Sequence, residues 1–146
     1  MLHRVKEKKL GRDAAHRKAL IKNLSTSIIE YKQVVTTLAK AKYARPFVEK
    51  LVTKAKQNKN LKGQKFAEAR LTTEKAVRAL FDEIVPQFET RVGGYTRIVK
   101  LPQRGGDTAK MARFEFVIDK PKKTVAKKAK EEVKETNKTE EKEVKE

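Results

Sequence analysis

The sequence predicts an α+β fold in which about four helices pack on a small three-stranded sheet. Two observations carry this prediction. Apolar residues recur at three- and four-residue steps through much of residues 13–86, which is the spacing of helices that bury one face. After Gly93-Gly94 the pattern changes to the alternation of strands, and one more β-branched stretch lies between the first two helices. These elements suit a sheet with helices on one face.

The first predicted helix runs from Asp13 to about Tyr31. Asp13 is expected to be its N-cap, because a carboxylate there can accept hydrogen bonds from the free amides of the first turn. A short strand is predicted to follow over residues 32–37, where β-branched residues concentrate. The apolar face of this first helix is expected to consist of Leu20, Ile21, Leu24 and Ile28.

The second predicted helix runs from Leu38 to Gln57 and is expected to be capped by Thr37. Pro46 lies inside it and predicts a kink or a break near Arg45, because proline removes one helical hydrogen bond and clashes with the preceding turn. The residues expected to face inward are Ala41, Ala44, Val48, Leu51, Val52 and Ala55.

Two shorter helices and a hairpin are predicted to complete the body. One helix covers about 61–71, and the next begins at Thr72 or Thr73 and ends at Pro86. The two strands of the hairpin are predicted over 95–101 and 111–118, around a loop rich in turn residues. The second strand is expected to place Ala112, Phe114, Phe116 and Ile118 on one side.

The charge of the chain indicates a polyanionic partner. The 146 residues carry a formal net charge of +18, and residues 1–119 hold 27 basic and 12 acidic side chains. A surplus of this size opposes compaction, so it is typical of proteins that bind nucleic acid. We divide the chain into a basic N-terminal arm (1–12), an RNA-binding body (13–119) and a Lys/Glu-rich tail (120–146) that is expected to be disordered.

Composition also argues against several other classes of function. The chain has no cysteine, which removes disulfides, thiolate metal sites and a thiol nucleophile. It contains no long apolar run and no signal-peptide core, so no membrane partner is expected and we predict a cytoplasmic protein. Two histidines make a poor zinc set, and no phosphate-binding loop is present. We therefore predict no enzyme activity, no cofactor and no small-molecule substrate.

The first 22 residues form the main candidate for RNA contact. They contain eight Lys or Arg and both histidines against two acids, and their apolar residues are too irregular to form one face. Such a segment is expected to become ordered only against a partner that neutralises its cations. The candidate residues are His3, Arg4, Lys6, Lys8, Lys9, Arg12, His16 and Arg17, together with Asn23, which shares the polar face of the first helix with Arg12 and His16.

The segment from Gly93 to Arg97 is the second candidate. Two glycines permit close approach to RNA or a positive φ, and Arg97 offers a charged fork. Tyr95 has two interpretations, as a stacking face for RNA bases or as a core residue at the start of a hairpin. Arg104, in the hairpin loop, is a third candidate.

Four segments resemble one known family in their order and spacing. They are MLHR, LGRDAAHRKALIKNL, VVTTLAKAKYARPFVEKLVTKAK and RVGGYTRIVK. Together they resemble the bacterial large-subunit ribosomal protein seventeen family over about residues 1–118. The resemblance implies an α+β protein that is ribosome-bound near the exit of the peptide tunnel. Its implied partners are large-subunit ribosomal RNA and neighbouring large-subunit ribosomal proteins.

The main alternative is a non-ribosomal architectural DNA- or RNA-binding protein with the same basic body. An architectural protein of the nucleoid is expected to dimerise and to bind duplex DNA broadly. A ribosomal protein is expected to be monomeric and to sediment with large subunits. An RNA-modifying enzyme, the third class, would need a small-molecule pocket, for which the sequence provides no residues.

Overall fold

A computed structural model of the chain describes residues 9–118 and confirms the predicted α+β class. A π-helical turn, η1 (Leu80–Ile84), joins α4 (Glu74–Ala79) and α5 (Val85–Gln87), so these three pieces form one continuous helical segment. Four helical segments therefore pack on three strands. In chain order the elements are α1 (Ala14–Tyr31), β1 (Gln33–Thr37), α2 (Leu38–Gln57), α3 (Leu61–Glu68), α4 (Glu74–Ala79), η1 (Leu80–Ile84), α5 (Val85–Gln87), β2 (Thr96–Lys100) and β3 (Met111–Phe116).

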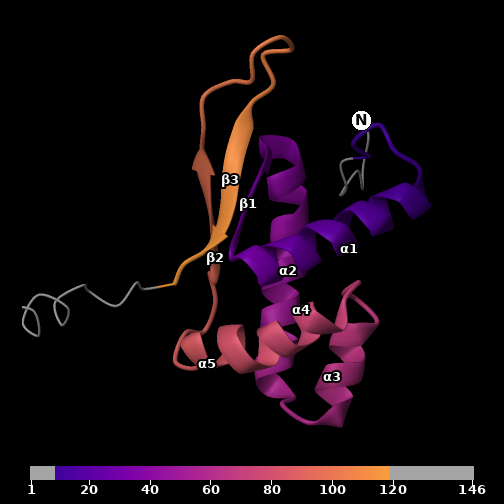
Figure 1. Cartoon of the computed structure of the whole chain (residues 1–146), viewed down its shortest axis with the longest axis vertical. Coiled ribbons are helices and arrows are strands. Elements are labelled where there is room, and N and C mark those ends of the chain that lie inside the picture. Colours follow the sequence, from indigo (N-terminus) through magenta and orange to yellow (C-terminus); the bar gives the residue numbers. More distant parts are fainter. Residues whose placement is uncertain (1–8, 119–146) are drawn as a thin grey trace, which may run out of the picture.

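The three strands form one antiparallel sheet in the order β1-β3-β2. The last strand of the chain is therefore central, and its Phe114 lies opposite Val34 on one side and Ile98 on the other. Helices α1 and α2 cover one face of the sheet, and the β2–β3 loop extends beyond its end (Figure 1). The predicted hairpin and the predicted strand near Val35 are both confirmed.

Helix α2 connects the sheet to the remaining helices. All six residues predicted to face inward are buried, so the periodicity of this helix identified its inner face correctly. Of the kink or break predicted near Arg45, the break is wrong, because α2 is continuous from Leu38 to Gln57; the kink stays a prediction. Pro46 lies on the exposed side of the helix, where water can hydrate the carbonyl of Lys42 that loses its helical partner.

Aromatic residues fill the space between the sheet and the α4–η1–α5 segment. The ring centroids of Phe88 and Tyr95 lie 5.3 Å apart, and those of Phe88 and Phe116 lie 5.9 Å apart. All three side chains are buried, as is Phe114 of the central strand. Rings at these separations add favourable quadrupole contacts to the burial of apolar area. This cluster fixes the sheet against the helices.

The helix caps differ in part from the prediction. Asp13 and Thr37 do occupy N-cap positions, but neither side chain accepts a hydrogen bond from the helix that it precedes, so the predicted side-chain caps are wrong. Thr73 does cap α4, since its hydroxyl accepts from the amide of Ala76 at 3.3 Å. At the other end of α1, Lys32 adopts the left-handed conformation with φ of 63°, which turns the chain directly into β1.

The helix predicted to end at Pro86 continues to Gln87 and contains a π-helical turn. In that turn the amide of Val85 donates to the carbonyl of Leu80, five residues earlier. Proline clashes with the carbonyl four residues before it and donates no hydrogen bond, so we attribute the wider turn to Pro86. Periodicity alone gave no signal for it.

Two predicted segments lie wholly or mostly outside the described residues. These are the tail, 120–146, and the first eight residues of the N-terminal arm. Within residues 9–118, no helix has the length and apolar character needed to cross a membrane.

Candidate nucleic-acid interface

The first half of α1 projects from the body of the protein. Its buried residues are confined to the second half of the helix, from Ser25 to Ile29, whereas Ala14, Ala15 and Ala19 are exposed. Figure 1 shows this end of α1 extending beyond the other helices. The projecting end is the N-terminal end of α1. The free amides at a helix N-terminus give it a partial positive charge, so this end is favourable for anions.

Basic side chains gather around this projecting end. The Arg17 guanidinium donates a hydrogen bond to the carbonyl of Arg12, and the Arg12 guanidinium contacts the imidazole of His16. Lys9 is exposed one turn earlier. Asp13 is the one acid at this end among the described residues, and it lies 3.9 Å from His16. The predicted candidates Lys9, Arg12, His16 and Arg17 are therefore brought together by the fold.

A tight turn precedes α1 and reverses the direction of the chain. Leu10 and Gly11 have φ values of 53° and 62°, and the amide of Arg12 donates to the carbonyl of Lys9 at 3.1 Å. Positive φ at both central positions is the geometry of a type I′ turn, which favours glycine at one of them. His3, Arg4, Lys6 and Lys8, the other predicted residues of the arm, lie outside the described residues.

Asn23 lies farther along α1, away from the cluster at the helix start. Its side-chain oxygen accepts a hydrogen bond from the Thr72 hydroxyl at 3.4 Å. The neighbouring Thr26 hydroxyl accepts from the amide of Thr72 at 3.0 Å. In this structure Asn23 therefore helps to hold α1 against the segment before α4, and its prediction as an RNA contact stays a prediction.

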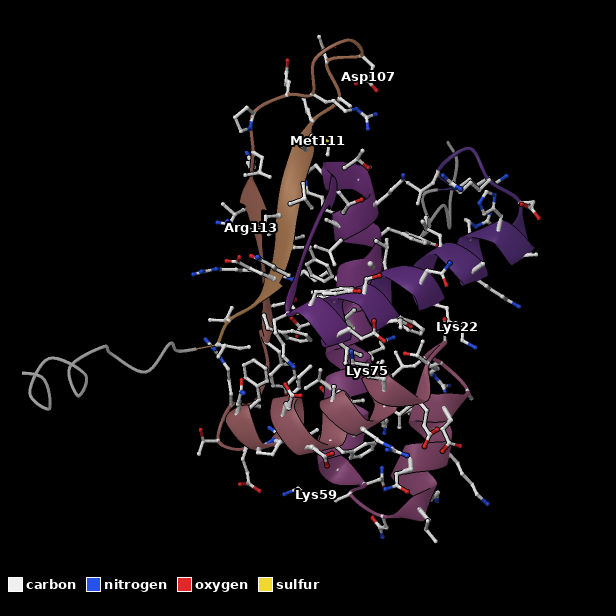
Figure 2. The ribbon with its side chains drawn as sticks, viewed as in Figure 1. Lys22, Lys59, Lys75, Asp107, Met111 and Arg113 are labelled. Carbon is white, nitrogen blue, oxygen red and sulfur yellow. The ribbon has the colours of Figure 1, made fainter. Side chains whose placement is uncertain are left out.

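The β2–β3 loop carries Arg104 at the far end of the hairpin. Its guanidinium makes a forked pair with Asp107, with Nε to Oδ1 at 3.1 Å and Nη2 to Oδ2 at 2.6 Å. This hydrogen bonding, with a further bond from the amide of Ala109, lowers the pKa of Asp107 to about 2. Figure 2 shows Asp107 at the tip of the hairpin. An RNA phosphate would have to compete with Asp107 for Arg104.

Arg97 lies on the face of the sheet that the helices leave uncovered. It donates to Glu115, whose other oxygen lies 2.9 Å from Nε of Arg113. Arg113 points to this same outer face in Figure 2, as its alternation with Ala112 and Phe114 requires. Arg97 is therefore accessible but already paired with a carboxylate.

Tyr95 is not a stacking surface, and that half of the sequence interpretation is wrong. Its side chain is 1% exposed and packs on Phe88, and its hydroxyl donates to the carbonyl of Val92 at 3.2 Å. Burial of the apolar ring of Tyr95 is favourable, so the core is its preferred place. The structure shows the alternative, in which Tyr95 is a core residue at the entry to the hairpin.

One carboxylate holds the start of β2 against α2. Glu49 accepts from the amide of Tyr95 at 3.1 Å, from the amide of Thr96 at 3.0 Å and from the Thr96 hydroxyl at 2.6 Å. Gly94, with φ of 66°, provides the turn that points these amides at Glu49. The glycines therefore support a structural junction, and Glu49 is a residue that the sequence interpretation missed.

Replacing Glu49 with Gln is expected to lower the free energy of unfolding by about 1–3 kcal/mol, because the variant leaves a buried amide without an acceptor. The side-chain amide has one oxygen for three donors, and its nitrogen would face the Tyr95 or Thr96 amide. Urea denaturation followed by circular dichroism measures the change.

Glu89→Gln is the matched control for this variant. Glu89 pairs with Lys59 at 2.6 Å on the exposed surface, so its loss is expected to change stability little. Equal losses in the two variants would contradict the role assigned to Glu49.

Half of the acids of the described residues lie in one segment of the chain. Residues 66–90 hold three basic and five acidic side chains, whereas the rest of 9–118 holds 21 basic and five acidic ones. Helix α4 and η1 belong to this acidic segment, and a shallow pocket there is lined by Glu30, Glu74, Asp82 and Glu83 with Lys75 and Arg78. The formal net charge of this segment is therefore −2 (3 − 5), whereas that of the other described residues is +16 (21 − 5).

Helix α2 adds cations that the candidate set omitted. Lys42, Arg45, Lys50 and Lys54 are all exposed and occupy the side of α2 opposite its buried residues. The signal was present in the sequence, because basic residues fill most of the gaps between the apolar positions of this helix. Charge on a helix face is usually only solvated, so this pattern alone did not identify these residues as candidates.

Comparison with known proteins finds one family throughout. Residues 20–117 match the family described as Ribosomal protein L17. A "Large ribosomal subunit protein bL17" of Neorickettsia sennetsu is 49% identical over 117 residues, which are 80% of this chain and 100% of the relative. That of Akkermansia muciniphila is 48% identical over 127 residues, 87% of this chain and 92% of the relative. That of Erythrobacter litoralis is 46% identical over 117 residues, 80% and 83% of the two chains.

Proposed function

The chain belongs to the ribosomal protein L17 family of the large ribosomal subunit, and on that premise we propose that it binds large-subunit ribosomal RNA by neutralising phosphates. The family is structural, so the chain is not an enzyme. As the resemblance implies, we place its binding site near the exit of the peptide tunnel, with other ribosomal proteins as neighbours and with the chain ribosome-bound in the cytoplasm.

The observation that carries this proposal is the gathering of cations without ion pairs at the projecting end of α1. At the projecting end of α1, Lys9, Arg12, Arg17 and Lys18 form no ion pair with a described carboxylate. On α2, Lys42 and Lys50 likewise have none within residues 9–118. Such cations release counterions when they meet phosphates, which is the main source of affinity in this class of complex.

The acidic segment gives the proposal an orientation. Phosphates repel carboxylates, so the side formed by α4 and η1 is expected to face away from the RNA. There the acids also hold the nearby cations, since Glu74 pairs with Arg78 and Glu83 pairs with Lys32 at 2.6 Å. The hydrogen bond from Lys32 keeps the pKa of Glu83 below its usual value.

In this proposal, Arg97 and Arg104 each exchange the carboxylate that they now bind for an RNA phosphate. Each guanidinium is exposed and held by a carboxylate, so it is already oriented but must give up that pair to bind a phosphate. The arm residues His3, Arg4, Lys6 and Lys8 are proposed to become ordered between RNA helices.

Sedimentation of a tagged copy through a sucrose gradient tests the proposal directly. The tagged chain is expected in the large-subunit fraction and, because RNA holds it there, to be released after ribonuclease treatment of the particles. A chain found at the top of the gradient, or with duplex DNA, would contradict it. A density map of the purified large subunits would test the location near the tunnel exit.

A further inference from the structure

A groove between α2 and α3 is lined by apolar and aromatic side chains. Its volume is about 780 Å³, which lies in the range of roughly 300–1,000 Å³ typical of small-ligand sites. Of the segments predicted to contact RNA, only that from Gly93 to Arg97 reaches this groove, through Gly93, so the groove adds a feature to the interface described above. Its lining includes Phe47, Leu51 and Phe66, with Lys50, Lys54 and Arg70.

One wall of this groove is a planar stack. The guanidinium of Arg70 lies over the ring of Phe66, with Cζ at 3.5 Å from the ring centroid. A hydrogen bond from Nη1 of Arg70 to the carbonyl of Phe66, at 3.1 Å, holds the guanidinium in this position. The ring covers one face of the guanidinium, which leaves the other face for a second planar group. Held by the carbonyl and the ring of Phe66, the Arg70 guanidinium offers a flat cationic surface rather than a mobile charge.

The charges at the groove favour an anionic occupant. Lys50 and Lys54 stand on α2 four residues apart and form no ion pair within the described part of the chain. The one carboxylate in the lining, Glu49, is occupied by the Tyr95 and Thr96 amides. The groove therefore combines aromatic walls with uncompensated positive charge.

We propose that this groove binds one unpaired nucleobase of RNA. The base stacks against Arg70 and Phe47, and Lys50 and Lys54 bind the phosphates on either side of it. A base within a duplex could not enter, because its two faces are covered by its neighbours. Single-stranded RNA presents the flat ring and the flanking charges together, and aromatic or Arg surfaces are the usual partners of such bases. The inference rests on the proposed binding of ribosomal RNA and identifies where a single-stranded nucleotide would bind.

The absence of tryptophan from the sequence makes a direct test possible. Phe47→Trp places a single indole in the groove, and a stacked base is expected to quench its fluorescence. The probe is a short single-stranded RNA. Inorganic polyphosphate of equal charge is titrated separately as the control ligand. Leu61→Trp is the matched control, because Leu61 lies on α3, is 74% exposed and does not line the groove.

Quenching of the indole at position 47 by RNA, without quenching by polyphosphate or at position 61, is the expected result. Arg70→Lys keeps the charge and removes the flat guanidinium, so it is expected to weaken this quenching. Phe47→Ala is expected to lower the affinity for the same RNA by about 5- to 150-fold, which is the loss of one base–aromatic stack.

The outcomes separate this inference from the proposed function. If RNA binds, as measured by its own anisotropy, but the indole at position 47 is unaffected, then the groove is not a base site and the proposed function stands. If no RNA binds, both the groove inference and the proposed function are contradicted. If a neighbouring ribosomal protein rather than RNA changes the fluorescence, the groove is a protein-docking site and the inference is overturned.

A second measurement uses the unaltered chain, in case a variant does not fold. RNA that carries a photoreactive base is cross-linked to the protein, and the attached peptides are identified by mass spectrometry. Cross-links to the peptide that contains Phe47 or Phe66 are expected. Cross-links confined to α1 and the hairpin would overturn the inference.

Discussion

Binding of the protein to large-subunit ribosomal RNA fragments is expected to weaken by about 10³–10⁵-fold when salt rises from about 50 to 200 mM. This range corresponds to contact with about 6–10 phosphates, for which the unpaired cations of α1 and α2 are sufficient. Filter binding or anisotropy at a series of salt concentrations gives the slope of the affinity. A flat response would contradict binding through phosphates.

Two double variants with equal loss of charge separate local contact from overall charge. Lys9→Ala with Arg12→Ala removes two cations from the projecting end of α1, and is expected to reduce the salt slope by about two. Lys75→Ala with Arg78→Ala removes two cations from the acidic side and is expected to leave the slope nearly unchanged. Equal effects of the two double variants would show that only net charge matters and would remove the proposed orientation.

Phe114→Ala is expected to reduce the free energy of unfolding by about 3–5 kcal/mol, because it removes a large ring from a fully buried site and leaves a cavity. Phe114 lies in the central strand between Val34 and Ile98, so neighbours on both sides lose contact. Such a loss is a large part of the stability of a domain of this size. Urea denaturation measures it.

Val35→Ala serves as the control for this second variant. Val35 is in the same sheet but 57% exposed on the uncovered face, so less than about 1 kcal/mol is expected from its truncation. A small loss in Phe114→Ala would mean that the centre of the sheet is not the centre of the core.

Residues with a strong periodic pattern were predicted well from the sequence. The bounds of α2 and all six of its buried residues were predicted correctly, because a long amphipathic helix repeats the same signal over five turns. The hairpin was predicted from its alternation, and the cations that surround the start of α1 were predicted from their density. These are local signals, and tertiary packing did not override them.

The residues that were missed depend on contacts between distant segments. Tyr95 and Glu49 meet across 46 positions of sequence, so nothing near either residue indicates that the motif around Gly94 is a junction between β2 and α2. Gly63 is a similar case. A Cβ there would lie 1.7 Å from the carbonyl oxygen of Asn58, a contact that only the folded loop before α3 creates.

The candidate site was predicted only in part, for a physical reason. Charge density identifies which residues attract phosphate, but not which of them already have a partner. Arg97 and Arg104 are as basic in sequence as Lys50, yet each is held by a carboxylate in the fold. No signal in the sequence indicated the groove beside α3, because Phe66 and Arg70 form a flat surface only when α3 and the turn that follows it bring the guanidinium over the ring.

The turn at Leu10 and Gly11 sets the direction in which the polypeptide leaves the folded body. A side chain at Gly11 would collide with nothing within 4 Å, so substitution there would cost little packing and would act through its φ of 62° alone. A mutation at this site would therefore spare the architecture and redirect whatever lies upstream. Assembly with a crowded partner could then fail although the packing of the core remained intact.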